Sequence, residues 1–162
     1  IGVEDGLSQN TVYDLLQDQR GFIWVATQNG LNRFDGSSFK VFQGESGAAR
    51  GLTSDAIFSL SEDFDGKIWV GTLNGVNIYD PAMESFSSLE LALPSGNPVS
   101  GIVRDMTLDR EGKVLMVIAD SCVFRAGPVP GEASLFYTAP KGSEIRSICT
   151  DPEGNLWLPC DL

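Results

Sequence analysis

The feature that most constrains the fold of this chain is an internal repeat. The stretch Gly21–Asp35, GFIWVATQNGLNRFD, returns 45 residues later as Gly66–Asp80, GKIWVGTLNGVNIYD. Carried back to residues 6 and 51, the two copies align without a gap and share 13 of 30 residues. Weaker copies of the Asp-x-x-Gly core follow, and the four anchoring aspartates, spaced by 45, 46 and 42 residues, are Asp18, Asp63, Asp109 and Asp151. A period of about 40 to 45 residues indicates either propeller blades or a solenoid of helical pairs.

The local residue pattern separates these two architectures. Each repeat carries short runs rich in Val, Ile, Phe, Tyr and Trp that are bounded by turn residues, as strands are. No window places apolar residues at the i, i+3, i+4 and i+7 spacing of a helix. The first repeat therefore predicts strands over 12–18, 22–27, 31–35 and 39–42, and the first three recur 45 residues later. Four short antiparallel strands per repeat describe one blade of a β-propeller.

Two kinds of turn join these strands. Asn29-Gly30 and Asn74-Gly75 suit two-residue hairpins of type I′, which need positive φ at both central residues. The Asp-x-x-Gly stretches suit slightly longer loops. There we expect the carboxylate to accept hydrogen bonds from turn N–H groups, with the glycine in the left-handed conformation.

We therefore expect an all-β fold, a partial β-propeller of about three and a half four-stranded antiparallel blades. Residues 1–162 would form one incomplete segment, with blades over approximately 6–50, 51–96, 97–140 and 141–162. Because one blade cannot bury both faces of its sheet, neighbouring blades stack on one another. The side chains expected to fill the gaps between blades are Trp24, Trp69 and Trp157.

The two ends of the sequence add an expectation about assembly. The fourth repeat stops before its third and fourth strands, with Pro159 and Cys160 where the second repeat has Gly71 and Thr72. The sequence begins at Ile1 rather than at Met. We expect a processed or excised piece whose ring is completed by the remaining blades of a longer chain, or else a homo-oligomer.

Composition excludes several classes of function. The formal net charge of −11 disfavours nucleic acid and anionic membrane surfaces as partners, because phosphate neutralisation needs Lys and Arg. No run of about 18 apolar residues exists, so no direct membrane insertion of this segment is expected. The absence of His removes Ser-His-Asp and Cys-His catalysis and His-ligated metals. We expect no catalytic residue, no metal and no cofactor.

The chain has three cysteines, Cys122, Cys149 and Cys160. Their number is odd and none of them form a Cys-x-x-Cys motif, which argues against both a disulfide framework and a zinc site. Neighbouring strands of the fourth repeat can bring the last two near each other. We nevertheless expect buried free thiols, because an unpaired Cys behaves as a small hydrophobic residue.

The repeats also resemble a known family. The segments GLSQNTVYDLLQDQRGFIWVATQNGLNRFD and GLTSDAIFSLSEDFDGKIWVGTLNGVNIYD are similar to the two-component regulator propeller repeat. The resemblance implies the periplasmic sensor region of a bacterial membrane receptor. Such blades precede a transmembrane helix and a cytoplasmic output, either a histidine kinase or a GGDEF-type cyclic-dinucleotide synthase. It implies no catalytic residue in the blades themselves.

Propeller geometry predicts where a ligand would bind. The first strand of each blade and the loops that lead into it gather at the centre of one face, and counting five residues back from each anchoring aspartate gives one side chain per blade. Aromatic and arginine side chains at such positions suit an oligosaccharide or an anion. The alternative is that the aromatic residues pack between blades and the arginines pair with local carboxylates. The candidate ligand-binding residues are Asn10, Tyr13, Asp55, Phe58, Arg104 and Arg146.

Three classes of function remain open from the sequence. The leading one is a non-enzymatic sensor segment that binds a small molecule or an oligosaccharide. The second is a protein–protein scaffold that drives receptor dimerisation. The third is a propeller enzyme such as a lyase or a glycosidase.

Overall fold

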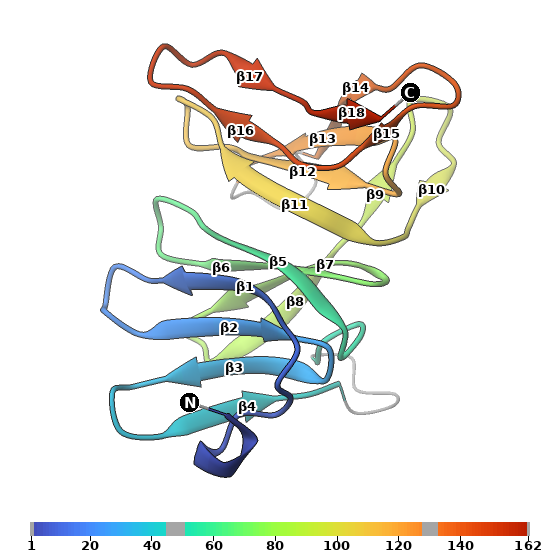
Figure 1. Cartoon of the computed structure of the whole chain (residues 1–162). Coiled ribbons are helices and arrows are strands. Elements are labelled where there is room, and N and C mark those ends of the chain that lie inside the picture. The colour runs from blue at the N-terminus through green and yellow to red at the C-terminus, as the bar shows by residue number, and fades with distance from the viewer. Residues whose placement is uncertain (1, 45–50, 128–132, 162) are drawn as a thin grey trace.

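Strands account for nearly all regular structure in this chain. The computed structural model describes residues 2–44, 51–127 and 133–161, and its one short helical turn there is η1, Val3–Asp5. Three four-stranded antiparallel sheets follow in sequence order (Figure 1). The first blade is β1 Val12–Gln17, β2 Ile23–Thr27, β3 Gly30–Phe34 and β4 Phe39–Phe42. The second blade is β5 Ile57–Glu62, β6 Ile68–Thr72, β7 Gly75–Asp80 and β8 Ser85–Leu89. The third blade is β11 Val103–Leu108, β12 Val114–Ile118, β13 Cys122–Ala126 and β14 Ser134–Thr138.

Smaller strand pairs complete the described chain. A hairpin, β9 Leu91–Ala92 with β10 Pro98–Val99, links the second and third blades. The fourth blade consists of its two inner strands, each of them interrupted. Its pairs are β15 Glu144–Ile145 with β18 Cys160–Asp161, and β16 Cys149–Thr150 with β17 Leu156–Trp157.

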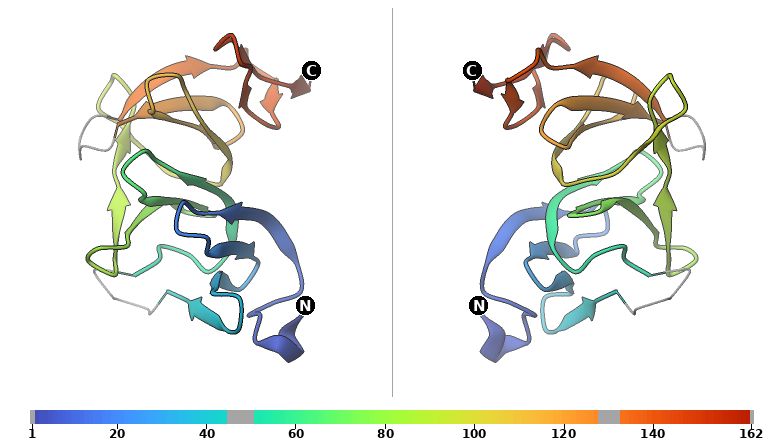
Figure 2. Two further views of the ribbon diagram at one scale, coloured as in Figure 1. Left: turned by 90° about the vertical axis from the view of Figure 1, so that its left-hand side faces the viewer. Right: turned by 90° about the vertical axis from the view of Figure 1, so that its right-hand side faces the viewer.

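The blades stack face to face, with the first strand of each on the inside. β1 packs beside β5, and β5 packs beside β11, while the outer strands fan away from this line (Figures 1 and 2). The expected all-β partial propeller is therefore confirmed, and the strand limits of the first repeat agree with the expected ones to within one residue. Nearly the same strands recur in the second and third blades.

Each seam between blades holds its own hydrophobic cluster. Trp24 of the first blade is fully buried against Tyr79 of the second, with ring centroids 5.2 Å apart. Trp69 occupies the same place in the seam between the second and third blades, and Leu115 occupies it between the third and fourth. Burying one such indole stabilises the fold by roughly 2–3 kcal/mol or more.

The expected burial of Trp157 is wrong. Its side chain is 58% exposed, because no blade of the described chain packs over that face of β17. It nevertheless keeps the local geometry of the two buried tryptophans. Its indole Nε1–H donates to Oδ2 of Asp151 at 3.0 Å, as in the first two blades.

The Asp-x-x-Gly turns have the expected bonding. In the first blade, Oδ1 of Asp18 accepts from the main-chain N–H groups of Arg20 and Phe22 at 3.0 and 2.9 Å. Gly21 follows with φ of +88°. Asp63, Asp109 and Asp151 accept from their own turns in the same way.

The expected type I′ turns at Asn-Gly are wrong. The two-residue loop is Gln28–Asn29, and Asn29 is not among the described residues with positive φ. Gly30 begins β3 with φ of +122°. The hydroxyl of Thr27 accepts from Asn29 N–H at 3.2 Å and donates to Gly30 C=O at 2.8 Å, so this side chain stabilises a different turn. The second blade repeats the arrangement with Thr72 and Asn74.

Two consecutive positive φ values, which a type I′ turn requires, occur in the third blade instead. They belong to Ala119 and Asp120, at 52° and 57°, in a turn closed by Ser121 N–H on Ile118 C=O.

The cysteines are free thiols, but the expected burial is wrong for two of them. Cys122 is half-buried, whereas Cys149 and Cys160 are exposed. The latter two lie in the fourth blade, where two strands cover little surface. In the part of the chain that the structure describes, no helix has the length and apolar character needed to span a bilayer.

Candidate functional site

Each complete inner strand carries a β-bulge at the same position. The register with the second strand shifts between Val12 and Asp14, and it shifts again at the equivalent places in β5 and β11. A bulge leaves one extra residue in its strand, and such bulges often re-aim a side chain beside a functional site. The three extra residues are Tyr13, Phe58 and Arg104.

The fourth blade continues this series. Ile145 pairs with Cys160 and Cys149 pairs with Trp157, so three residues of the first strand face two of the second. Arg146 is the first of these three, and its N–H donates to Pro159 C=O at 2.9 Å. The four positions found by counting back from the aspartates therefore share one structural role. We call Tyr13, Phe58, Arg104 and Arg146 the bulge row.

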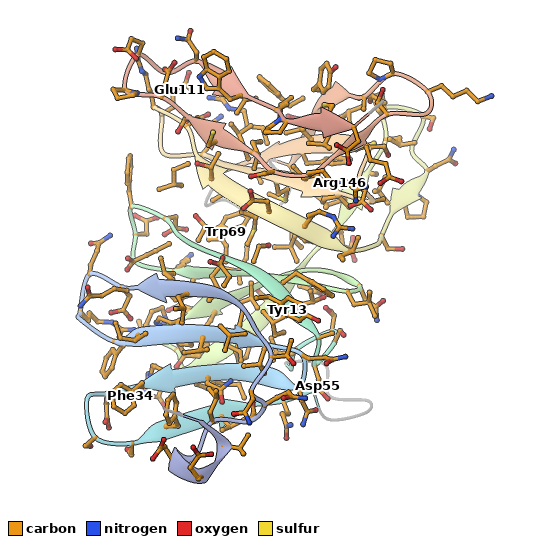
Figure 3. The ribbon with its side chains drawn as sticks, viewed as in Figure 1. Tyr13, Phe34, Asp55, Trp69, Glu111 and Arg146 are labelled. Carbon is orange, nitrogen blue, oxygen red and sulfur yellow. The ribbon has the colours of Figure 1, made fainter. Side chains whose placement is uncertain are left out.

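The aromatic half of the bulge row is a pair of adjoining rings. Tyr13 and Phe58 have centroids 4.9 Å apart at an interplanar angle of 32°. Tyr13 remains 44% exposed, so one surface of this pair is open to solvent. Figure 3 shows Tyr13, Asp55 and Arg146 toward one edge of the stacked blades, while Phe34 lies at the opposite edge.

The cationic half of the bulge row is paired with carboxylates. Arg104 donates to both oxygens of Asp120, with Nη2 and Oδ2 2.8 Å apart. This hydrogen bond holds the pKa of Asp120 below its usual range and raises the pKa of Arg104. Arg146 lies 2.7 Å from both Asp161 and Glu144. Three carboxylates thus surround two guanidinium groups, and the local charge is not positive.

Asn10 and Asp55 make main-chain contacts in the loops that lead into the inner strands. Oδ1 of Asn10 accepts from Val3 N–H at 3.0 Å. Oδ1 of Asp55 accepts from Gly44 N–H at 2.6 Å, and the Asp55 carbonyl accepts from Gly30 N–H at 2.7 Å. Both residues hold neighbouring segments in place.

The residue after each bulge ties its blade to the next one, which the sequence reading missed. Oδ2 of Asp14 accepts from Leu60 N–H at 2.7 Å, and Oγ of Ser59 donates to Val103 C=O at 3.0 Å. Oδ2 of Asp105 accepts from Ile148 N–H at 2.9 Å. Burial raises the pKa of Asp14. The available signal was a polar residue four places before each anchoring aspartate.

A second missed feature is a polar network behind the hairpin turn. In the first blade, Ser8 N–H donates to Oδ1 of buried Asn32 at 2.9 Å, and the hydroxyls of Ser8 and Thr27 lie 2.9 Å apart. Thr53, Thr72 and Asn77 repeat this network in the second blade. In the third blade the equivalent positions are all apolar, which avoids leaving one buried polar partner unsatisfied. They are Val99, Ile118 and Phe124.

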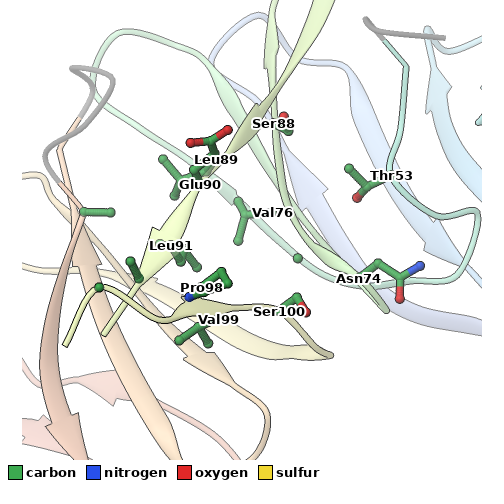
Figure 4. A pocket seen from close by; sticks show the side chains of 14 residues that line it. Thr53, Asn74, Val76, Ser88, Leu89, Glu90, Leu91, Pro98, Val99 and Ser100 are labelled. Carbon is green, nitrogen blue, oxygen red and sulfur yellow. The ribbon is translucent and has the colours of Figure 1, made fainter. Parts of the chain in front are cut away.

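One concavity of the described chain lies away from the bulge row. It is an open groove of about 710 Å³ between the second blade and the β9–β10 hairpin (Figure 4). Val76 and Leu91 form part of its apolar wall, and Asn74, Ser88 and Glu90 supply polar groups. Within the described residues, no group of three or more His, Cys, Asp or Glu is placed to hold a metal ion.

Comparison with known proteins agrees with this architecture. Residues 6–29 and 51–74 match the family described as two component regulator propeller. Over 39 residues, 24% of this chain, the sequence is 54% identical to histidine kinase P4 of Formosa agariphila. The chain spans only 3% of that relative's length.

Among solved structures, the extracellular domain of BT3049 from B. thetaiotaomicron, assigned to the hybrid two component systems, superimposes with a TM-score of 0.82 at 25% identity. The match covers 98% of this chain and 23% of that one. Virginiamycin B lyase from Staphylococcus aureus superimposes with a TM-score of 0.71 over 91% of this chain and 48% of its own. At 15% identity, the likeness to the lyase concerns the fold alone.

Proposed function

The chain carries repeats of the two component regulator propeller family, and on that premise we propose that it is a non-enzymatic part of the periplasmic sensor region of a bacterial signalling receptor. The similarity to the extracellular domain of BT3049 and to a histidine kinase supports this role. The observation that carries a binding function is the bulge row, where four blades place one side chain each at the same inner position.

We further propose that the ligand is an uncharged oligosaccharide rather than an anion. Both arginines of the bulge row already pair with carboxylates, so an anion would have to displace Asp120 or Asp161. The exposed face of Tyr13 offers an apolar platform for a sugar ring, and the paired charged groups offer donors and acceptors for hydroxyls. A sugar that binds through its hydroxyl groups can form hydrogen bonds with these charged side chains and leave the ion pairs in place.

The same geometry supplies a path from binding to the blade seams. The residue following each bulge is bonded to the next blade, as Asp14 is to Leu60. A ligand that shifts Tyr13 would therefore act on the hydrogen bond of its immediate neighbour. In a receptor, such a change would be passed along the stacked blades.

Calorimetry with neutral and sulfated oligosaccharide panels tests this proposal, using Tyr13→Ala and Met83→Ala as a matched pair. Both side chains are exposed, but Met83 lies outside the bulge row. We expect Tyr13→Ala to weaken binding about tenfold, as loss of an aromatic contact does, and Met83→Ala to leave it unchanged. Binding only of the sulfated panel would contradict the assigned ligand class. Cleavage of any oligosaccharide would favour the lyase or glycosidase alternative.

Exposed blade faces favour a second candidate function, a scaffold that joins chains. Leu15 is 63% exposed, whereas its equivalent Leu60 is buried under the blade that bears Trp24. Trp157 is the exposed counterpart of Trp24. We propose that the Trp157 face of one copy covers the Leu15 face of a second copy, with the packing already present between the first two blades.

A further inference from the structure

The dipeptide Asn-Gly occurs twice in this chain, at Asn29-Gly30 and Asn74-Gly75, in equivalent hairpins. At such a pair the main-chain nitrogen of the glycine can attack the Asn side-chain carbonyl carbon. The amide nitrogen then leaves as ammonia, and water opens the resulting succinimide to aspartate or isoaspartate. Glycine favours this reaction because it has no side chain to hinder the approach or restrict the backbone. The Asn-Gly dipeptide alone therefore predicts the same reaction at both sites, and a difference in rate between them must come from the fold.

The first site is closed. The attacking group, Gly30 N–H, is held by the Asp55 carbonyl at 2.7 Å. The Asn29 carbonyl accepts from Nε2 of Gln43 at 3.0 Å, which fixes the peptide from its other side. The space is also filled, because a Cβ at Gly30 would lie 2.9 Å from the Phe42 carbonyl oxygen.

The second site is open. In the described part of the chain, Gly75 N–H makes no backbone hydrogen bond outside its own sheet, and a Cβ there would meet no atom within 4 Å. Asn74 is exposed, and its main-chain N–H donates to Oγ1 of Thr72 at 3.0 Å. The strand register places Glu90 where the first blade has Gln43. An ionised carboxylate cannot donate to the Asn74 carbonyl as the Gln43 amide does to Asn29.

We propose that Asn74 is a site of spontaneous deamidation and that the fold protects Asn29 from the same reaction. The product carboxylate lies on the rim of the groove that Asn74 and Glu90 both line (Figure 4). Conversion replaces a neutral amide by a second negative charge at that rim. Isoaspartate also lengthens the main chain within a two-residue turn. The groove therefore changes its chemistry with the age of the protein, independently of the bulge row.

The test is incubation of the purified chain at 37 °C and mildly alkaline pH, followed by peptide mapping with mass spectrometry and enzymatic isoaspartate labelling. We expect Asn74 to convert about tenfold faster than Asn29 in the folded chain, the ratio that one hydrogen bond can supply. In urea the two rates should agree within about twofold, since the difference comes from folded structure. Equal rates in the folded chain, or faster conversion of Asn29, would overturn the proposal.

A matched pair of substitutions tests the cause. Gln43→Glu removes the donor to the Asn29 carbonyl and should raise the conversion rate of Asn29 several-fold. Glu90→Gln introduces the missing donor in the second blade and should slow conversion of Asn74. If both variants keep the wild-type rates, the protection is not exerted through these side chains and that part of the account is wrong.

Discussion

Trp24 and Asp18 are joined by a hydrogen bond from the indole Nε1–H to carboxylate Oδ2 at 2.9 Å, and both groups are buried. The same carboxylate organises the turn before β2 through its other oxygen. One aspartate thus fixes both the turn and the rotamer of the side chain that covers the next blade. Trp69 with Asp63, and Trp157 with Asp151, repeat the bond at 2.8 and 3.0 Å.

Replacing each tryptophan by alanine should separate its packing from its local bonding. We expect Trp24→Ala and Trp69→Ala to lower the free energy of unfolding by about 3–5 kcal/mol, because each leaves a large cavity in a seam. Trp157→Ala makes the same chemical change at an exposed site and should cost less than about 0.5 kcal/mol. Urea titrations followed by circular dichroism measure all three. Similar losses at the three sites would contradict the assignment of the seams.

The third blade offers an exchange experiment. Leu115 stands where the other blades have Trp, and Arg125 donates to the free oxygen of Asp109 in its place. Arg125→Ile should lower the free energy of unfolding by about 1.5–3 kcal/mol, because it leaves that carboxylate oxygen without its charged donor. Adding Leu115→Trp should restore part of this loss, since Ile78 and Trp69 face each other in the second blade. Urea unfolding measures both variants. If the effects of the two substitutions on the free energy of unfolding simply add, a tryptophan at position 115 cannot replace Arg125 as the donor to Asp109.

The ion pair of Arg104 and Asp120 predicts a pH dependence with a definite sign. Arg104 lowers the pKa of Asp120 in the folded state relative to 3.8. The contribution of this pair to stability is therefore fully present above the unfolded pKa and is lost as pH falls through the folded one. Wild type should lose more stability than Asp120→Asn between neutral pH and about pH 3. Parallel thermal melting curves of the two proteins across that range would exclude the ion pair as a stabilising group.

Self-association through the exposed faces should depend on one residue at each face. Leu15→Glu places a charge on the exposed face of the first blade, at the position equivalent to buried Leu60 of the second blade. We expect this charge to abolish any dimer of the isolated chain. Trp157→Ala should act in the same direction. Phe64→Ala, at an exposed position outside both faces, serves as the control. Sedimentation at micromolar concentration reads out the mass, and a wild-type monomer would remove support for the scaffold role.

Much of the fold is predictable because short local sequence patterns determine it and these patterns recur in each repeat. The strand limits of the first blade and the bonding of Asp18 follow from apolar runs and from the Asp-x-x-Gly turn. The bulge positions could be numbered from the sequence, but not recognised as bulges. A bulge is a property of the pairing between two strands, and neither strand alone encodes it.

The remaining differences arise from contacts across strands or blades. The turn at Asn29 depends on the hydroxyl of Thr27, and the burial of Trp157 depends on whether another blade lies above it. Arg125 in β13 donates to Asp109 as a tryptophan of the second strand does in the other blades. A comparison of equivalent positions within one strand cannot detect this replacement, because the two donors come from different strands. In each case the deciding partner lies outside the local sequence pattern.

The most direct test of the account is an amide-resolved NMR titration of the chain with neutral oligosaccharides. If the bulge row binds, the largest shifts should fall at Tyr13, Phe58 and Arg104 and at the residues that follow them, Asp14, Ser59 and Asp105. Shifts confined to Asn74, Glu90 and the rest of the groove, or no shifts with any oligosaccharide, would contradict the claim that the bulge row is the ligand site.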